Sequence, residues 1–238
     1  MSLDVYADKE RLAEAAARFF VERAQGAIGG TGRFAVALAG GSTPQRAYEL
    51  LADAYRDDLD WGRVHVFFGD ERGVPPDHED SNYRMANEAL LSRVPVGSVH
   101  RMRGELPPSE AAADYERELR GFFGGPPVFD LVLLGVGEDG HTASLFPRTP
   151  ALDATERLAA ANPVEKLGTT RITLTAPTIN ASRNVAFLVS GGDKAEALKE
   201  ILEGDADPRD YPAKLIRPAG DPAWMVDRAA ARLLRAAP

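Results

Sequence analysis

An apolar run, a glycine-rich turn and two titratable side chains follow one another in the stretch FDLVLLGVGEDGHTASLFP, residues 129–147. The run from Phe129 to Leu134 is short and continuous, which is typical of a strand buried on both faces of a parallel sheet. The turn after it delivers Asp139 and His141, and His141 is one of four histidines in the chain. Because α/β proteins collect functional side chains at the carboxyl ends of their strands, this stretch predicts an α/β fold with a general base at a strand exit.

Similar short apolar runs alternate with helical patterns along the rest of the chain. This alternation predicts a largely parallel open sheet with helices on both faces, in one domain spanning residues 1–238. The further predicted strands are residues 34–39, 64–69, 159–161, 171–175 and 184–189. The predicted helices are residues 8–25 (ended by the glycines of 26–32), a segment from Pro44, residues 81–90, residues 109–123 with Ser109 as N-cap, residues 195–203, and an amphipathic tail at 222–234 in which Trp224 packs.

The composition limits the classes of function. Lys and Arg number 28 against 36 Asp and Glu, so the formal charge is −8, and an acidic chain without a basic run argues against a nucleic-acid or membrane-surface partner. The absence of cysteine excludes disulfides, a thiolate nucleophile and Cys-ligated metals. No apolar run approaches the roughly 18 residues that span a bilayer. Acidic residues at the start of the sequence argue against an export signal, so we expect a cytoplasmic protein.

Polar groups follow four of the apolar runs, and in a parallel sheet such groups meet at one edge. At the first of these exits, two glycines let the backbone approach a ligand and a helix N-terminus offers free N–H groups, which predicts a phosphate cradle. An ordinary turn with Ser42 or Thr43 as N-cap is the alternative, and the local sequence does not separate the two. The exits are GGST (residues 40–43), DER (70–72), GEDGH (137–141) and SGGDK (190–194).

Two other kinds of site fit parts of this pattern. The glycines at 135–140 match GxGxxG, but Asp139 would then lie beside a dinucleotide pyrophosphate, and Pro147 leaves little room for the helix that such a site needs. Ser42 and Ser144 are candidate nucleophiles of a serine hydrolase, but neither lies in a G-x-S-x-G elbow. A histidine that activates water is the simpler hypothesis.

The motifs ALAGGSTP (37–44), FFGDER (67–72), SNY (81–83), LLGVGEDGHTASLFP (133–147) and SGGDKA (190–195) resemble, in order, the signatures of the 6-phosphogluconolactonase family. GGSTP also occurs in the related glucosamine-6-phosphate isomerases and deaminases. Those relatives carry a pattern like DGHIAFNEP, with an acid for ring opening. Phe146 stands in its place here, which favours the lactonase over the isomerase.

The resemblance implies a Rossmann-like sugar-phosphate fold and hydrolysis of 6-phospho-D-glucono-1,5-lactone to 6-phosphogluconate. His141 would act as general base on water and Asp139 would orient it. The implied substrate contacts are Gly40, Gly41, Ser42 and Thr43 for the phosphate, Lys194 and Arg171 for its charge, Arg72 as a further anion contact and Asp70 for sugar hydroxyls. No metal or cofactor is required, and we expect a monomer or weak homo-oligomer. The rivals are an isomerase or deaminase on the same fold and a non-catalytic sugar-phosphate sensor.

Overall fold

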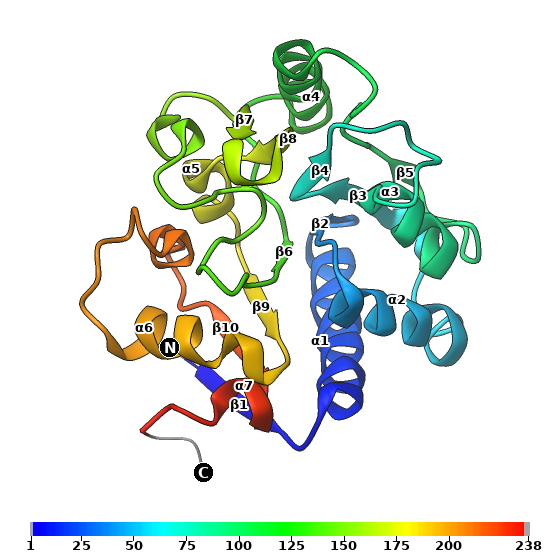
Figure 1. Cartoon of the computed structure of the whole chain (residues 1–238). Coiled ribbons are helices and arrows are strands. Elements are labelled where there is room, and N and C mark those ends of the chain that lie inside the picture. Colours follow the sequence, from blue (N-terminus) through cyan, green and yellow to red (C-terminus); the bar gives the residue numbers. More distant parts are fainter. Residues whose placement is uncertain (1, 236–238) are drawn as a thin grey trace.

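The computed structural model describes residues 2–235, and its main layer is a sheet of seven strands in the order β1-β10-β9-β6-β2-β3-β5. Every pairing in this sheet is parallel (Figure 1), so the predicted parallel sheet is confirmed. Its strands are β1 (Ser2–Tyr6), β2 (Phe34–Leu38), β3 (Val64–Phe68), β5 (Ser98–Val99), β6 (Leu131–Leu134), β9 (Val185–Val189) and β10 (Ala223–Asp227).

The central strands are buried on both faces, which explains their continuous apolar sequences. In β6, Leu131 and Leu133 belong to one hydrophobic cluster, whereas Val132 and Leu134 belong to another. Each cluster is closed by helices, and Figure 1 shows α1 and α2 on one side of the sheet and α6 on the other. The predicted cover of helices on both faces is therefore confirmed.

The helices differ widely in length, and among residues 2–235 none is long and apolar enough to cross a membrane. The α-helices are α1 (Lys9–Thr31), α2 (Ser42–Ala54), α3 (Asn82–Ala86), α4 (Pro108–Phe123), α5 (Ala176–Asn180), α6 (Ala195–Glu203) and α7 (Arg228–Ala231). A π-helical turn, η2 (Asn87–Leu91), continues α3. The 3-10 turns are η1 (Trp61–Arg63), η3 (Pro150–Asp153), η4 (Glu165–Leu167), η5 (Gly192–Lys194) and η6 (Pro212–Leu215).

A second, antiparallel sheet contains β4 (Asp70–Arg72), β8 (Thr169–Leu174) and β7 (Ala159–Val164). The predicted strands 159–161 and 171–175 correspond to β7 and β8, but the sequence does not show that they form a separate sheet, and β4 is not predicted because it is a short charged segment without an apolar run. Gly69 joins the two sheets: its N–H donates to Leu38 of β2, and its carbonyl accepts from Leu174 of β8. The small sheet therefore begins at the carboxyl end of β3, where the polar strand exits gather.

The predicted amphipathic helix at residues 222–234 is wrong. Ala223–Asp227 is strand β10, which pairs with β1 on one side and β9 on the other, and only Arg228–Ala231 is helical. The sequence does not predict strand β1 either, and β1 forms the edge of the sheet beside β10. A short apolar run such as AWMV fits a buried strand as well as a helix, so only its neighbours decide between them. Trp224 packs as predicted: its ring stacks on that of Phe187, with the ring centroids 3.9 Å apart.

Two predicted helix boundaries are also wrong. Helix α1 continues through Gly29 and Gly30 to Thr31 and ends at Gly32, whose φ of 81° is the left-handed conformation that favours glycine at a helix end. Ser109 is not an N-cap, because α4 begins at Pro108. Proline suits the first turn of a helix since its missing N–H leaves no bond unmade.

Candidate active site

A cavity of about 240 Å³ opens where β2, β3 and β6 end. Residues from all four predicted strand exits line it, so segments distant in sequence meet at one place. This is the position at which open α/β sheets bind their ligands. The lining residues are Ala39, Gly40, Gly41, Gly69, Asp70, Arg72, Asn82, Leu133, Leu134, Gly135, Val136, Gly137, His141, Ala143 and Lys194.

His141 and Asp139 form a hydrogen-bonded pair at the exit of β6. Asp139 Oδ1 lies 2.5 Å from His141 Nδ1 and also accepts the His141 backbone N–H at 3.1 Å. A carboxylate at Nδ1 favours the tautomer that carries its proton there, which leaves Nε2 as the basic nitrogen. The turn is closed by a bond from the Gly137 N–H to the His141 carbonyl. The structure therefore brings the two predicted side chains into one hydrogen-bonded pair, a geometry that suits a base and an orienting acid.

Two neighbours fix the position of the imidazole ring. A Cβ added to Gly137 would lie 2.0 Å from His141 Nδ1 and 2.1 Å from Cε1, so glycine is what lets the ring pack against this backbone. Phe146 stacks on the same ring, with centroids 4.1 Å apart and planes inclined by 23°. Phe146, the residue that distinguishes this sequence from the isomerase pattern, is thus a direct contact of His141.

Burial, together with nearby positive charges, keeps the imidazole neutral. Burial lowers the pKa of His141 to about 4; among the charged neighbours, Asp70 opposes this shift and Lys194, Arg171 and Arg72 add to it. At neutral pH the ring is therefore unprotonated and able to accept a proton. These four charged residues come from the small sheet and from the turn after β9, so segments distant in sequence act together on the imidazole.

Asp70 is held from two sides. Ser144 Oγ donates to its Oδ2 at 2.7 Å, and Asn82 Nδ2 donates to its backbone carbonyl at 2.9 Å. Ser144 is itself buried and its hydroxyl is directed at a carboxylate, so the geometry gives no support to a serine nucleophile at this position. Asn82 also lines the cavity, a position that its place in the SNY motif (81–83) does not by itself predict.

The GGST segment forms the start of α2. Gly41 is the N-cap, with a φ of 103° and no side-chain capping bond, so the alternative of Ser42 or Thr43 as N-cap is wrong. Without such a cap, the N–H groups of the first turn remain available to a ligand. Thr43 Oγ1 lies 2.7 Å from Ser190 Oγ, which ties this helix start to the exit of β9. Gly40 is needed for close approach, since a Cβ there would lie 2.0 Å from Asn82 Oδ1.

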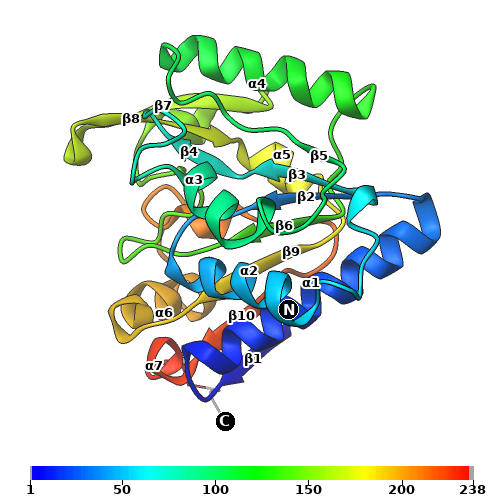
Figure 2. The ribbon, with the colours of Figure 1, turned by 90° about the vertical axis from the view of Figure 1, so that its right-hand side faces the viewer.

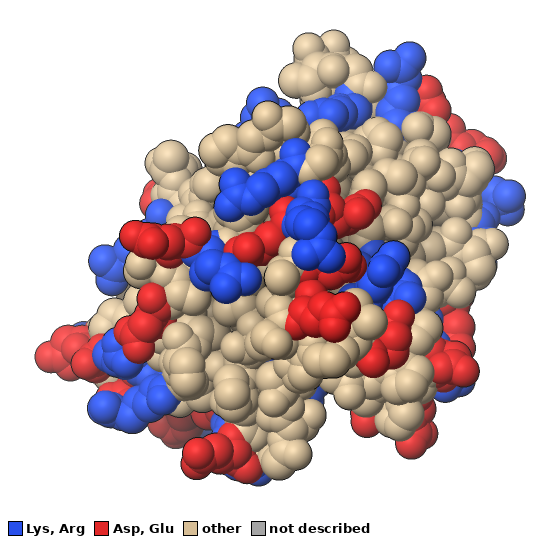
Figure 3. Space-filling view, turned by 90° about the horizontal axis from the view of Figure 1, so that it is seen from above, with Lys and Arg blue, Asp and Glu red and all other residues tan. Residues whose placement is uncertain are grey.

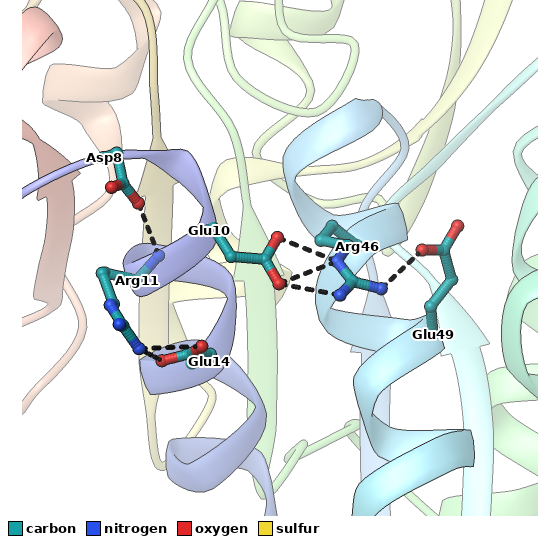
Figure 4. A network of polar contacts seen from close by, with 6 residues as sticks. All are labelled: Asp8, Glu10, Arg11, Glu14, Arg46 and Glu49. Atoms are coloured by element: carbon teal, nitrogen blue, oxygen red, sulfur yellow. Dashed lines mark hydrogen bonds and ion pairs between the residues drawn. The ribbon is translucent and has the colours of Figure 1, made fainter.

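Helix α1 brings a further cation to the same place. Lys9 Nζ donates to Ser42 Oγ at 2.8 Å. Behind it, the Arg46 guanidinium on α2 binds Glu10 of α1 through two nitrogens and Glu49 of its own helix (Figure 4). Exposed ion pairs contribute little stability each, but this group fixes the two helix starts against one another. Lys9 was not predicted, because it lies far from GGST in the sequence.

Three further cations flank the cavity. Arg72 and Arg171 lie opposite each other in the β4–β8 ladder, and burial and Arg72 lower the pKa of Arg171. Among the described side chains, Arg171 Nε is a buried nitrogen without a hydrogen-bond partner. Lys194 Nζ lies 2.8 Å from Asp193 and 3.6 Å from Glu138. Two adjacent guanidinium groups, one of them with an unpartnered buried nitrogen, favour an anionic ligand.

Metal and nucleotide sites find less support. Within residues 2–235, no three His, Asp or Glu side chains are grouped to hold a metal ion. The GxGxxG glycines shape the turn that carries His141, and Pro150 begins a short 3-10 turn rather than the long helix that a dinucleotide needs.

A parallel sheet whose strand exits unite an acid–base pair with several cations around one small cavity defines an α/β enzyme for a small anionic substrate. Residues 7–224 match the family model described as glucosamine-6-phosphate isomerases/6-phosphogluconolactonase. The chain belongs to this family.

Relatives and solved structures agree with this assignment. The chain is 46% identical over 240 residues to a 6-phosphogluconolactonase of Synechocystis sp., covering 98% of each chain. It is 42% identical to the human 6-phosphogluconolactonase, covering 98% of this chain and 93% of the human one. The solved structure of 6-phosphogluconolactonase from Trypanosoma brucei superposes with a TM-score of 0.86 at 32% identity, covering 98% of each chain.

Proposed function

We propose that this chain hydrolyses 6-phospho-D-glucono-1,5-lactone to 6-phospho-D-gluconate, in the oxidative branch of the pentose phosphate pathway. The observation that carries the proposal is the His141–Asp139 pair, which leaves a basic nitrogen beside a cavity flanked by cations. The family membership and the names of the relatives support the same reaction.

The substrate carries a phosphate at one end and a lactone at the other, and the site has a separate region for each. The phosphate binds at the start of α2, to N–H groups and hydroxyls of Gly40–Thr43. Lys194 and Arg171 supply charge-assisted hydrogen bonds, and Arg72 supplies a further one. Asp70, held rigidly by Ser144, accepts from sugar hydroxyls.

The chemistry is a base-assisted attack of water. His141 Nε2 removes a proton from water as its oxygen bonds to the C1 carbonyl carbon, and the carbonyl becomes an oxyanion. When the tetrahedral intermediate collapses, the bond from C1 to the ring oxygen breaks, and the imidazolium returns the proton to that oxygen. Asp139 stabilises the imidazolium. The N–H groups of Gly137, Gly140 and His141 already have partners within the turn, so the oxyanion needs other donors.

The residues that the structure describes do not supply the features that the two rival functions need. An aldose–ketose isomerase needs an acid where Phe146 packs on His141. A sensor that acts on nucleic acid needs a basic face, whereas the face in Figure 3 shows Lys and Arg among Asp and Glu. We further propose that residues 1–238 form one domain that acts in the cytoplasm on a small sugar phosphate. We expect this enzyme to be a monomer or a weak homo-oligomer.

A coupled assay tests the proposal. Lactone is generated freshly and 6-phosphogluconate is measured with its dehydrogenase, at a pH where spontaneous hydrolysis is slow. His141→Ala is expected to lower kcat by about 10²–10⁴-fold, the usual contribution of general-base catalysis, while 6-phosphogluconate still binds. Unchanged turnover would remove His141 from the mechanism. Release of ammonia or fructose 6-phosphate from glucosamine 6-phosphate would establish the isomerase or deaminase instead.

A further inference from the structure

The end of the β7–β8 hairpin stands out from the body of the molecule (Figure 2). It consists of the turn η4 (Glu165–Leu167) and Gly168, whose φ of 60° ends that turn. Leu167 is exposed, with 47% of its surface accessible to solvent. Lys166, between these residues, reaches back toward the catalytic turn.

Lys166 contacts two residues that themselves contact the catalytic base. Its Nζ donates to Asp139 Oδ2, the carboxylate oxygen that His141 does not use. The same ammonium lies 4.9 Å from the centroid of the Phe146 ring, which stacks on His141. Cations are attracted to aromatic faces, so the two contacts reinforce one another.

From these contacts we propose that Lys166 is a positioning residue for the general base, holding Asp139 in place and dividing its negative charge between the ammonium and the imidazole. This inference rests on the proposed function, in which His141 is that base. A carboxylate bound at one oxygen only can rotate about its side-chain bonds, whereas one bound at both oxygens is fixed. The hairpin end thereby acts on the reaction without touching the reacting atoms.

If the Asp139 charge is divided in this way, removal of the Lys166 charge changes the pKa of His141. A Lys166 that only stabilised the fold would not have this effect. With the ammonium removed, the full charge of Asp139 acts on the imidazolium, so His141 holds its proton more tightly. With the Asp139 charge removed instead, His141 holds its proton less tightly. The charged groups that bear on His141 are Asp70, Arg72 and Arg171 of the small sheet, Lys194 after β9, Asp139 in its own turn, and Lys166 through Asp139.

The test compares Lys166→Met, which removes the charge, with Lys166→Arg, which keeps it. Lys199→Met is the matched control, since Lys199 is an exposed lysine on α6. Lys166→Met is expected to lower kcat about five- to tenfold with KM unchanged and to move the acid limb of kcat/KM to higher pH. The effect is modest because an ion pair of a half-exposed lysine is weak. Lys166→Arg is expected to restore most of kcat, and Lys199→Met to match the wild type.

A titration of the His141 ring by NMR separates this inference from the proposed function, because it needs no substrate. The His141 signal is assigned by its loss in His141→Ala. Its pKa is expected to rise in Lys166→Met and to fall in Asp139→Asn, even if the wild type were inactive on the lactone. An unmoved titration with kcat within twofold of the wild type would overturn the inference, as would a raised KM at constant kcat, which would make Lys166 a substrate contact.

Discussion

Gly137→Ala is a sharp test of the catalytic geometry, because it adds one methyl group beside the base and removes nothing. The added Cβ would lie 2.0 Å from His141 Nδ1, 2.1 Å from Cε1 and 2.9 Å from Asp139 Oδ1. These three nearest atoms all belong to side chains, those of His141 and Asp139, which can move. We therefore expect the variant to fold, with the imidazole displaced from its position.

The size of the displacement follows from ordinary contact distances. Non-bonded heavy atoms sit about 3.5 Å apart, so a ring atom at 2.0 Å must retreat by roughly 1.5 Å. A misplacement of about 1 Å can cost 10²-fold in rate. We expect kcat to fall about 10²-fold, equivalent to about 2.7 kcal/mol in activation free energy. KM and the affinity for 6-phosphogluconate should change little, since the proposed phosphate contacts lie elsewhere.

The assay is the coupled lactone measurement, together with thermal unfolding and binding of 6-phosphogluconate. Gly121→Ala is the control: it makes the same chemical change on helix α4, where an added Cβ meets no atom within 4 Å. It should retain full activity and gain up to about 1 kcal/mol in stability, because alanine favours a helix over glycine.

Two results would refute the reasoning. If Gly137→Ala kept kcat within about threefold of the wild type, the exact position of the imidazole would not matter to the rate. If the variant lost product binding and thermal stability along with activity, the methyl group would be disrupting the turn rather than the ring.

Three more predictions follow from the same geometry. The acid limb of kcat/KM should fall near pH 4, because the pKa of His141 is lowered to about 4 and protonation below that value removes the base. The acid limb of kcat should lie at higher pH, since a bound phosphate neutralises the cations around the ring. Acid limbs of kcat and kcat/KM at the same pH would contradict this prediction. Lys9→Met and Lys194→Ala should each raise KM severalfold at constant kcat, measured by initial rates, and a loss confined to kcat would exclude a role in binding phosphate. Glu71→Gln should lower the free energy of unfolding, measured by urea titration, by about 1–3 kcal/mol. The buried carboxylate accepts hydrogen bonds from three backbone N–H groups and one hydroxyl, and an amide cannot accept all four. An unchanged unfolding midpoint would show that these hydrogen bonds are dispensable.

The sequence predicts those parts of the fold whose signals are local. Strands β2, β3 and β9 lie within one residue of the predicted runs at each end, because continuous apolar segments bounded by glycine have few alternatives. The strand β1 is different: it lies at the sheet edge, is only partly buried and carries a weak pattern. The sequence of its partner β10 predicts a helix, because nothing in the local pattern shows that this segment lies between two strands of the assembled sheet.

The same distinction holds in the candidate site. Asp139 and His141 are two residues apart, so their pairing could be inferred from the turn itself. Lys166 contacts Asp139 across 27 positions and Lys9 contacts Ser42 across 33, and nothing in the local sequence links these residues. Long flexible side chains on otherwise polar segments look like solvated surface until the fold brings a partner to them.

The division of the site between two sheets explains why the unpredicted part matters for function. The main sheet supplies the glycine turn, the base and the helix start, all of which depend on backbone geometry. The small sheet supplies most of the charges that act on the base, through Asp70, Arg72 and Arg171, and its hairpin end carries Lys166. The main sheet therefore determines where His141 lies, and the charges of the small sheet and its hairpin adjust a proton affinity that burial already lowers. Variation in the short β4–β8 ladder and its hairpin can shift the pH dependence of the reaction while the parallel sheet, and the place where the lactone is attacked, stay the same.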